Sequence, residues 1–252
     1  MTASPLLSII VPVLNEEGQI SDLLNGLAER CSHPSMELIL VDGGSVDHTL
    51  DEIDHLLKQD WPFTLALVRS PKGRAVQMNH GVASSSGSIL YFLHADTLPP
   101  KGFDRQILQA NAQGQRAGCF RMRFDQDHPV LAFSQWFTRF NVKFCRGGDQ
   151  SLFIERKAFK ELGGFDPSFE VYEDCEFVGR IYDKVGFVVL KDYVTTSARL
   201  YETNGTWRLQ YHFTVIHLKH RLGASPNELS RYYKAKIQPL KPDKAAKMSL
   251  KT

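Results

Sequence analysis

Four short, almost continuous apolar runs in the first 94 residues constrain the fold more than any other feature of the sequence. They are rich in Ile, Val and Leu and cover residues 6–13, 36–42, 63–69 and 89–94. Runs of this length are typical of strands that are covered on both faces, as in a parallel sheet. Helical patterns separate them, at residues 18–30, 48–58 and 73–84. This alternation predicts right-handed βαβ units and an α/β fold with a Rossmann-like, mostly parallel central sheet flanked by helices.

Acidic residues recur at the carboxyl ends of these runs. Glu16 follows the first run, Asp42 closes the second and Asp96 follows the fourth. In open α/β sheets, ligands bind outside the carboxyl ends of the strands. We therefore expect these three carboxylates to line one site. Ser45 or Asp47 is placed to cap the helix that begins near residue 48.

The second half of the chain is less regular. Its patterns predict helices at residues 103–113, 157–162, 173–184 and 227–236, and strands at 118–124, 151–154, 187–190 and 194–197. The run Gly147-Gly148-Asp149-Gln150 has the chemistry of a turn. We expect one domain over residues 1–222 and a C-terminal helix at 223–238. Residues 239–252 are Lys-rich and interrupted by Pro, which predicts a disordered tail.

Two apolar patterns at helical spacing have more than one interpretation. The first comprises Trp207, Tyr211, Val215, Leu218 and Leu222. It fits a helix that packs on the core or, less simply, one that lies on an anionic bilayer. The second comprises Phe133, Trp136, Phe137, Phe140 and Phe144. It indicates core packing or the wall of a cleft rather than a platform for nucleic-acid bases, because no basic stripe accompanies it.

Charge and composition argue against several classes of protein. Thirty Lys and Arg against 28 Asp and Glu leave a formal charge of +2, too balanced to predict nucleic-acid binding. The chain has no run of 18 apolar residues and no signal-peptide pattern, so we expect a cytoplasmic protein that spans no membrane. The four cysteines are far apart, which predicts reduced thiols rather than a zinc site or a disulfide scaffold.

Five short motifs follow one another in the first 174 residues. They are P-x-x-N-E at residues 12–16, V-D-G-G-S at 41–45 with Asp47, Lys72-Gly73-Arg74, H-A-D at 94–96, and Glu173-Asp174. Together they resemble the family 2 glycosyltransferases of GT-A fold, over about the first 200 residues. Arg199, in Ser197-Ala198-Arg199, resembles a late basic residue of a subgroup linked to arsenosugar biosynthesis. The resemblance implies a nucleoside diphosphate sugar as donor and a hydroxyl group as acceptor.

The resemblance also implies a role for each motif. The expected nucleotide-sugar-binding residues are Pro12, Glu16, Asp42, Lys72, Arg74 and Asp96. Of these, Glu16 and Asp42 would hold the base and ribose. Lys72 and Arg74 would reach the diphosphate, or form a solvated basic loop. The expected acceptor-side residues are Gly148, Asp149, Gln150 and Glu173.

Asp174 corresponds to the catalytic base of the family. The implied reaction is a single inverting displacement, in which Asp174 takes the proton of the acceptor hydroxyl as that oxygen attacks the anomeric carbon. Asp174 also lies at the predicted start of a helix, where an acid favours the helix dipole without any catalytic role. Both interpretations remain open at this stage.

The implied cofactor is a divalent metal, Mn²⁺ or Mg²⁺. Asp96 corresponds to the last acid of the family's D-x-D metal site, whereas His94 stands where the first acid usually lies. Imidazole binds Mn²⁺ but suits Mg²⁺ poorly. We therefore expect Asp96 to be the principal metal ligand and His94 a second one.

Two other functions are compatible with parts of the sequence. A nucleotidyltransferase would share the scaffold but would carry a Gly-rich, basic loop after the first strand, where this chain has the acidic Asn15-Glu16-Glu17. A noncatalytic nucleotide-sugar-binding or scaffold protein would account for the incomplete D-x-D triplet. Uridine diphosphate is the default nucleotide on family frequency. A lipid-linked acceptor, with peripheral contact to the inner face of the membrane, stays open if residues 206–222 lie on a bilayer.

Overall fold

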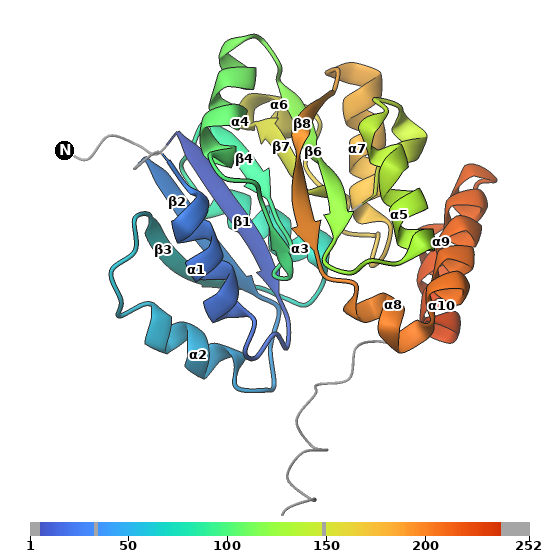
Figure 1. Cartoon of the computed structure of the whole chain (residues 1–252), viewed down its shortest axis with the longest axis horizontal. Coiled ribbons are helices and arrows are strands. Elements are labelled where there is room, and N and C mark those ends of the chain that lie inside the picture. The colour runs from blue at the N-terminus through green and yellow to red at the C-terminus, as the bar shows by residue number, and fades with distance from the viewer. Residues whose placement is uncertain (1–5, 33–34, 148–149, 238–252) are drawn as a thin grey trace, which may run out of the picture.

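One eight-stranded sheet organises the molecule. The computed structural model describes residues 6–32, 35–147 and 150–237, to which all structural statements refer. The strand order is β3 (Thr64–Arg69), β2 (Met36–Asp42), β1 (Leu7–Val13), β4 (Ile89–Phe92), β7 (Leu152–Glu155), β6 (Ala117–Phe124), β8 (Val188–Thr196) and β5 (Thr97–Leu98). The first four strands are parallel, and β8 is parallel to β6 (Figure 1). β7 and β5 run antiparallel to their neighbours. The predicted α/β fold with a mostly parallel sheet is confirmed.

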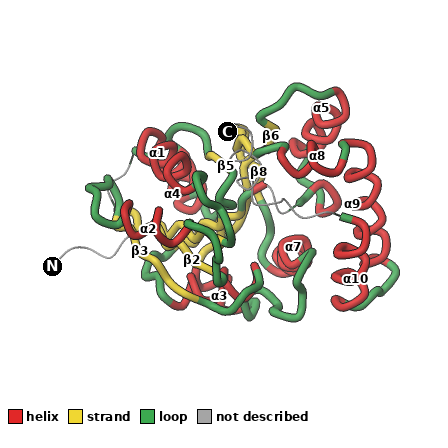
Figure 2. Tube along the Cα trace, turned by 90° about the horizontal axis from the view of Figure 1, so that it is seen from below, coloured by secondary structure: helices red, strands yellow, loops and turns green. Residues whose placement is uncertain are grey.

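Helices cover both faces of the sheet and its far end (Figure 2). One face carries α1 (Ile20–Arg30), α2 (Thr49–Leu56) and α4 (Phe103–Ala112). The other carries α3 (Arg74–Ala83), α6 (Arg156–Glu161) and α7 (Glu173–Lys184). The end beyond β6 holds α5 (Pro129–Trp136), the short 3₁₀ turns η1 (Phe137–Arg139) and η2 (Lys143–Cys145), α8 (Arg199–Asn204), α9 (Thr206–Arg221) and α10 (Pro226–Lys236).

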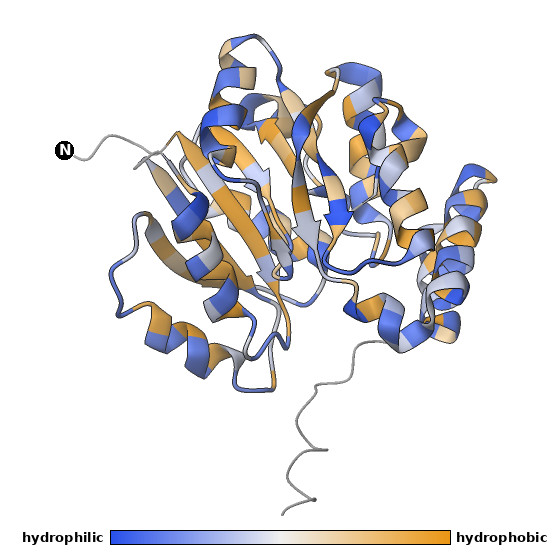
Figure 3. Cartoon of the chain, viewed as in Figure 1, coloured by the Kyte–Doolittle hydropathy of each residue, from blue (hydrophilic) through white to orange (hydrophobic). Residues whose placement is uncertain are grey.

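The core has two layers, one on each face of the sheet. Strand β4 shows why, because all four of its side chains are buried. Tyr91 points to one face, where its ring lies 5.7 Å from Phe103 and 6.4 Å from Phe120. Phe92 points to the other face, 4.9 Å from Phe165. The central strands are accordingly the most continuously apolar part of the chain (Figure 3).

The predicted elements match the observed ones closely in the parallel half. The strand at residues 36–42 and the helix at residues 173–184 have the predicted bounds. The late strands predicted at 187–190 and 194–197 form one strand, β8, instead of two. Exposed Lys191 and Asp192 interrupt its apolar pattern at an irregularity of the strand, where the pairing with β6 passes from Leu190 directly to Tyr193.

The core-packing interpretation of the stripe on α9 is wrong. Trp207, Tyr211, Leu218 and Leu222 are 75, 64, 55 and 78% exposed. The helix packs through Leu209 and Ile216, which are buried. Because α9 has apolar side chains on more than one face, spacing alone did not identify the face that meets the core.

The core-packing interpretation of the aromatic segment is also wrong. Phe133, Trp136, Phe137, Phe140 and Phe144 of α5, η1 and η2 are 67, 44, 37, 40 and 73% exposed. Four of them form a connected surface cluster, with ring centroids 4.8 to 5.3 Å apart at its three shortest contacts. One of the five, Trp136, lines a cavity.

Three further expectations concern the whole chain. All four cysteines are free thiols, as predicted. Within the described residues, no helix combines the length and apolarity needed to cross a membrane. The C-terminal helix is observed as α10, whereas the division at residue 222 stays a prediction and the predicted tail at 239–252 lies outside the described residues.

Candidate active site

The site lies where the order of the strands reverses. β1 pairs with β2 on one side and with β4 on the other, so the loops that follow β1 and β4 diverge from the same edge. Pro12 lies on β1 close to this reversal. β4 pairs with β1 only at residues Leu7 to Ile10, so Pro12 lies beyond that pairing. A residue without a backbone N–H is tolerated there because no ladder bond is lost.

A buried glutamine fixes the ends of β1 and β2. The Nε2 of Gln77, on α3, donates to the carbonyl oxygens of Val13 at 2.8 Å and Val41 at 2.7 Å. Gly43 follows Val41 closely, and a Cβ at this position would lie 2.8 Å from the Gln77 amide. Any residue larger than glycine at position 43 would therefore displace the Gln77 side chain. The sequence patterns gave Gln77 no role.

Asp42 is buried at the carboxyl end of β2. Its carboxylate accepts hydrogen bonds from the backbone N–H groups of Gly44 at 2.9 Å and Ser45 at 3.1 Å. These bonds hold the loop after β2 in one conformation, with Gly44 in the left-handed region at φ +92°. Asp42 lies at the predicted edge of the sheet, and its carboxylate is hydrogen-bonded to its own loop.

The loops after β1 and β2 are bonded to each other. Asp47 accepts hydrogen bonds from Glu17 N–H and from the Thr49 hydroxyl, and Thr49 in turn accepts from the N–H of Glu16 at 2.8 Å. The cap prediction holds for Asp47 and is wrong for Ser45. The helix α2 begins at Thr49, and its N-cap residue, His48, makes no side-chain cap bond, but Asp47 Oδ1 accepts from the N–H of Thr49 at 3.1 Å. Ser45 instead accepts from the N–H of Asn15 in the neighbouring loop, and the other oxygen of Asp47 accepts from Glu17 of that loop.

Arg199 bridges two of the predicted acids. Its Nη2 lies 3.3 Å from Glu16 Oε2 and 3.4 Å from Asp96 Oδ2. The strands bring Arg199 there, because β5 pairs with β8 and the N–H of Ser197 donates to the Asp96 carbonyl at 3.1 Å. The Nε of Arg199 is buried and makes no hydrogen bond within the described part of the chain.

Glu16 is half-buried beside a second acid. Burial raises the pKa of its carboxyl above the usual 4.5, Arg199 lowers it and Asp96 raises it, with a net upward shift. Ionised Glu16 is therefore held at a cost to stability, and the Arg199 guanidinium offsets part of this cost. A raised carboxyl pKa next to a specific charge partner is common at functional sites.

His94 and Asp174 form the second contact of the site. His94 Nε2 lies 3.8 Å from Asp174 Oδ2, and both side chains are mostly buried. His94 is two residues before Asp96, so β4 and the residues after it connect this pair to the Arg199 cluster. Asp174 is the second residue of α7, where the helix dipole also favours its negative charge.

Strained backbone surrounds these residues. Only three non-glycine residues of the described chain have positive φ: Asn15 at 56°, Ser151 at 61° and Tyr172 at 74°. Asn15 precedes Glu16, and Tyr172 precedes Glu173 and Asp174. An aromatic residue in the left-handed region is an outlier that the surroundings must enforce. The Tyr172 hydroxyl is fixed by His217 Nδ1 at 2.9 Å, and its ring lies 4.5 Å from the ring of His220.

The remaining predicted residues are distributed around this centre. Arg74 opens α3, and its Nη1 lies 3.9 Å from Oε1 of the buried Glu173. Lys72 is exposed in the preceding loop. The structure therefore brings Arg74 to the start of α7, whereas Lys72 has no contact that would place it at the acids.

The predicted acceptor segment is only partly visible. Gly148 and Asp149 lie outside the described residues. Gln150 is buried, and its amide donates to the Cys145 carbonyl at 2.9 Å and accepts from Arg146 Nη1 at 2.8 Å. Arg146, itself buried, also donates to the Thr138 carbonyl at 2.8 Å. Gln150 thus anchors the loop, and its side chain is committed to that task.

No group of three or more His, Cys, Asp or Glu side chains in the described chain is arranged to hold a metal ion. Asp96 has one oxygen beside Arg199, and His94 faces Asp174. Mn²⁺ and Mg²⁺ in nucleotide sites are nevertheless often held by one or two protein groups together with phosphate oxygens and water. The donor set is compatible with that arrangement and not with an all-protein metal cage.

Chemically, the arrangement offers a cation, Arg199, between two carboxylates. It also offers a carboxylate that can accept a proton, Asp174, which lies 3.8 Å from His94, two residues before Asp96. Sequence reasoning found the acids and gave no site role to Arg199, Gln77 or Tyr172. A signal for Arg199 was present in its resemblance to a late basic residue. Nothing in local spacing identifies Gln77, because its partners are backbone carbonyls.

Two relatives show how far the similarity extends. A PGL/p-HBAD biosynthesis glycosyltransferase of Mycobacterium bovis is 39% identical over 201 residues, 74% of this chain and 73% of that protein. The succinoglycan biosynthesis protein ExoA of Rhizobium meliloti is 27% identical over 199 residues, 71% of this chain and 58% of ExoA. The chain thus spans little more than half the length of the second relative.

A solved structure and the family comparison agree with these relatives. The mannosyltransferase PcManGT of Pyrobaculum calidifontis, solved with GDP-Man and Mn²⁺, superposes with a TM-score of 0.67 at 19% identity, over 93% of this chain and 69% of that one. This similarity confirms the expected GT-A fold. The sequence profile of glycosyl transferase family 2 matches residues 8–161, more than half of the chain, which therefore belongs to this family.

Proposed function

We propose that this chain transfers a sugar from a nucleoside diphosphate sugar to a hydroxyl group of an acceptor. The observation that carries the proposal is the position of Asp174, whose Oδ2 lies 3.8 Å from His94 Nε2. His94 in turn is two residues from Asp96, the residue expected at the diphosphate. In an inverting displacement the acceptor hydroxyl attacks from the side of the anomeric carbon opposite the diphosphate, and a carboxylate across the sugar from the diphosphate would take its proton. Membership of the family supports the same class of reaction.

In the proposed reaction, Asp174 acts as general base in a single inverting displacement at the anomeric carbon. The acceptor oxygen forms the new bond as the bond to the diphosphate breaks, and its proton passes to Asp174. A carboxylate suffices because the hydroxyl becomes acidic only as the new bond forms. Arg199, Arg74 and Lys72 stabilise the charge that develops on the diphosphate. The buried Nε of Arg199, which has no partner within the described residues, supports a site built for an anion.

The donor's nucleoside is proposed to lie over the ends of β1 and β2. Glu16 and Asp42, with Pro12 beside them, are the residues assigned to the base and ribose. Both carboxylates are at the same edge of the sheet, with Val13 and Asp42 directly paired. Uridine diphosphate is the default nucleotide. Because PcManGT was solved with GDP-Man, guanosine diphosphate is the first competitor to test.

We propose that the reaction depends on Mn²⁺ or Mg²⁺. Asp96 would hold the metal, with His94 as a second ligand, and the diphosphate and water would complete its shell. The metal would supply positive charge to the leaving diphosphate. In this proposal Asp96 would contact both Arg199 and the metal, whereas Glu16 would contact Arg199 and the nucleoside. Asp96→Ala should therefore weaken nucleotide binding more in Mn²⁺ than in its absence.

Glu173 and the turn at residues 147–150 are proposed to form the acceptor side. Glu173 is buried at the start of α7 with Arg74 at 3.9 Å, an arrangement that suits a residue positioning its neighbour Asp174. The assignment of Gly148 and Asp149 rests on the resemblance alone. Gln150 would act by holding the loop through Arg146.

Nucleotide binding is the first test of the donor assignment. Thermal unfolding is measured with UDP, GDP, CDP and TDP, each with and without Mn²⁺, for the wild type and for Asp96→Ala. A ligand at 100 times its dissociation constant stabilises the native state by about 2.7 kcal/mol, which such an assay resolves. A Mn²⁺-dependent shift for one nucleotide that is lost in Asp96→Ala supports the donor and metal assignments. No shift with any nucleotide contradicts them.

Turnover separates an enzyme from a noncatalytic binding protein. Release of nucleotide from the donor sugar is measured for the wild type, for Asp174→Asn and for Asp54→Asn, a matched change at an exposed position of α2. Loss of a general base lowers the rate by about 10² to 10⁴. Asp174→Asn should show this loss with unchanged nucleotide affinity, and Asp54→Asn should behave as the wild type. Full activity in Asp174→Asn would refute its role, and inactivity of every form would favour a scaffold.

A lipid-linked acceptor and peripheral contact with an anionic bilayer are proposed for the same protein. The exposed Trp207, Tyr211, Leu218 and Leu222 of α9 support this, since interfacial helices present such side chains to lipid. Co-sedimentation with phosphatidylserine vesicles should fall in a Trp207→Ser, Leu218→Ser double variant. Leu57→Ser, at an exposed leucine beyond α2, is the control. Equal sedimentation of all three forms contradicts the proposal.

The place of the chain among its relatives is also a proposal. Arg199 supports the arsenosugar-biosynthesis subgroup, because it combines the resemblance in sequence with a position between two site carboxylates. The assignment says nothing about which sugar is transferred.

A further inference from the structure

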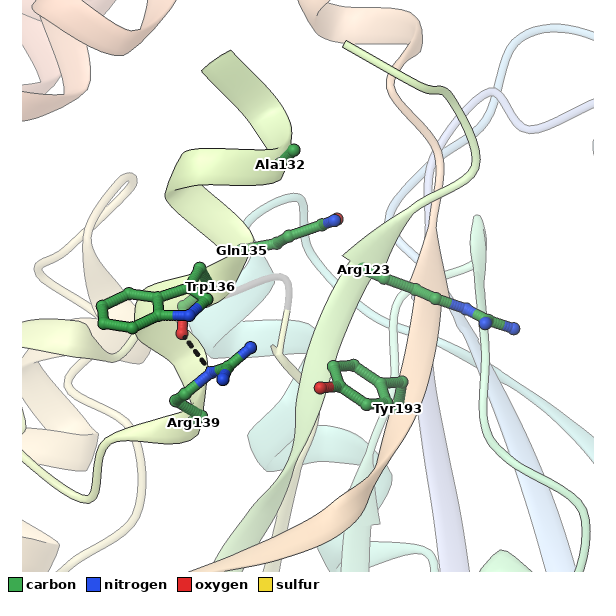
Figure 4. A pocket seen from close by; sticks show the side chains of 6 residues that line it. All are labelled: Arg123, Ala132, Gln135, Trp136, Arg139 and Tyr193. Carbon is green, nitrogen blue, oxygen red and sulfur yellow. Dashed lines mark hydrogen bonds between the residues drawn. The ribbon is translucent and has the colours of Figure 1, made fainter. Parts of the chain in front are cut away.

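A cavity of about 370 Å³ lies apart from the acidic residues, between the α5–η1 segment and strands β6 and β8 (Figure 4). It is lined by Arg123, Ala132, Gln135, Trp136, Arg139 and Tyr193. This volume is in the lower part of the range of small-molecule sites, about 300 to 1,000 Å³. Figure 4 shows Gln135 and Arg139 reaching from the helical segment toward Tyr193, with Arg123 extending across β8.

Two arginines, Arg123 and Arg139, line this cavity, and a third, Arg121, lies beside one of its lining residues, Tyr193. Arg121 and Arg123 are two residues apart on β6 and so leave the sheet on the same face. The guanidinium of Arg121 lies 5.9 Å from the ring of Tyr193, and that of Arg139 lies 4.9 Å from the ring of Trp136. None of the three arginines has a carboxylate within 4.0 Å among the described residues.

Hydrogen bonds hold the guanidinium groups of Arg123 and Arg139 in place but do not use all of their N–H donors. Arg123 Nε donates to the Thr195 hydroxyl at 2.9 Å, and Arg139 Nε donates to the Trp136 carbonyl at 3.0 Å. These bonds fix the direction of each side chain and leave its Nη atoms without a hydrogen-bond partner among the described residues. The Nε of Arg121 is buried and has no hydrogen-bond partner in the described part of the chain. Uncompensated positive charge is expected to attract an anion.

We propose that this cavity binds an anionic group carried on a sugar ring, a carboxylate or a phosphate, and that this sugar belongs to the acceptor. Guanidinium groups match carboxylate and phosphate oxygens in pairs, which gives affinity and orientation together. The rings of Trp136 and Tyr193 supply the flat apolar surface that the C–H face of a sugar ring packs against. The amide of Gln135, whose Oε1 already accepts from Phe124 N–H, retains its donors for a sugar hydroxyl.

The position of the cavity fits an acceptor. Thr195, which accepts from Arg123, is followed by Thr196, and the hydroxyl of Thr196 lies 2.9 Å from that of Thr97. Thr97 directly follows Asp96. The cavity and the acidic residues thus both lie at the end of β8, and in this proposal an acceptor of more than one sugar extends from one to the other. The identification of the bound sugar as the acceptor rests on the proposed function, whereas binding of an anionic sugar requires no turnover.

Direct binding tests the proposal. Glucose 1-phosphate, glucuronate, inorganic phosphate and neutral glucose are titrated by calorimetry into the wild type, Arg123→Gln, Arg139→Gln and Arg105→Gln. Arg105 is an exposed arginine of α4 outside the cavity and is the matched control. Trp136 fluorescence, read as the difference between the wild type and Trp136→Phe, reports binding at the cavity itself.

We expect at least one anionic sugar to bind the wild type more tightly than glucose and to change Trp136 fluorescence. Loss of one charge-assisted hydrogen-bonding group weakens binding about tenfold or more. Arg123→Gln and Arg139→Gln should each show this loss, and Arg105→Gln should not. Preference for glucose 1-phosphate or for glucuronate identifies the anion. Glucose binding as tightly as both, equal affinity in all four proteins, or no binding overturns the proposal.

A second readout separates this proposal from the proposed function. Asp174→Asn should bind the anionic sugar as the wild type does, because Asp174 is not part of the cavity. In a transfer assay, Arg123→Gln should raise the KM for the anionic acceptor and leave donor hydrolysis unchanged. If Asp174→Asn retains transfer, the proposed function is refuted and the binding proposal is unaffected. If Arg123→Gln and Arg139→Gln bind the anionic sugar as tightly as the wild type, the binding proposal is refuted and the proposed function is unaffected.

Discussion

Replacing Arg199 by Gln should destabilise the protein at neutral pH, because two carboxylates depend on one guanidinium. Nη2 of Arg199 is 3.3 Å from Glu16 and 3.4 Å from Asp96, and the side chains of Arg199, Glu16 and Asp96 are 32, 24 and 27% exposed. Without the guanidinium, two like charges remain close together. The loss therefore includes both attractions and an uncompensated repulsion.

The size of the effect follows from the exposure of these side chains. An exposed ion pair contributes about 0 to 1 kcal/mol, and removing one partner of a buried pair costs about 3 to 5 kcal/mol. The cluster lies between these limits and loses two pairs at once. We expect a decrease of about 2 to 3 kcal/mol in the free energy of unfolding, or about 4 to 12 °C in Tm for a chain of this size.

The pH dependence gives the sign of the effect. The pKa of Glu16 is raised in the folded state, so the folded chain binds this proton more tightly than the unfolded chain does. Stability from this group is present below its usual pKa of 4.5 and is lost as the pH rises through the folded value. Removing Arg199 raises the pKa of Glu16 further. The deficit of Arg199→Gln relative to the wild type should therefore be larger at pH 7.5 than at pH 5.

Urea unfolding at both pH values measures this deficit. A double-mutant cycle with Glu16→Gln isolates the interaction, since a neutral Glu16 side chain no longer needs the guanidinium. Arg199→Gln should cost less in the Glu16→Gln background than in the wild type. Arg105→Gln controls for the loss of one positive charge. An equal cost at both pH values and in both backgrounds would refute the electrostatic reasoning.

Three further predictions concern single side chains. Gln77→Leu leaves two strand-end carbonyls without their donor and should cost about 2 to 6 kcal/mol in urea unfolding, whereas exposed Gln59→Leu should cost less than about 0.5 kcal/mol. Burial, followed by the charge of His220, lowers the pKa of His217, so stability is lost as the pH falls through its usual value of 6.5; His217→Gln should flatten that acid slope in unfolding curves between pH 7 and 5. Arg146→Met removes the donors of the Thr138 carbonyl and of Gln150 and should lower Tm by at least about 4 °C by calorimetry, and an unchanged Tm would contradict a structural role for this buried arginine.

The parallel half of the fold could be predicted closely because its strands are buried on both faces. Strand β2 shows this, since its apolar run and its observed bounds coincide at Met36–Asp42. The same reasoning divided β8 into two strands, because this strand has exposed residues in its middle. Apolar continuity therefore predicts strands best where helices cover the sheet on both sides.

The acids of the site could be predicted because each follows a strand whose end is visible in the sequence. Arg199 could not be placed in the same way. It lies 183 residues from Glu16 and 103 from Asp96, and it meets them only because β8 pairs with β5. Antiparallel pairing of a two-residue strand leaves almost no local signal.

The surfaces were predicted least well. Spacing showed that residues 206–222 form a helix, but Leu209 and Ile216, rather than the Trp207 stripe, meet the core. Periodicity identifies an apolar face and does not say what covers it. The same holds for the aromatic residues of α5 and η1. Knowledge of the neighbouring elements was needed in both cases.

Strand β8 follows β1 to β7 in the sequence and is therefore synthesised after them. A chain that has left the ribosome only as far as β7 contains Glu16 and Asp96 but not Arg199. Synthesis proceeds from the N-terminus, so the strands of the parallel half, β1 to β4, are available first. At that stage the two acids lack their counter-charge, and the edge of β6 that pairs with β8 is still unpaired. Formation of the β6–β8–β5 ladder completes the sheet and neutralises the site in one event, so that a competent anion site exists only in a nearly finished fold.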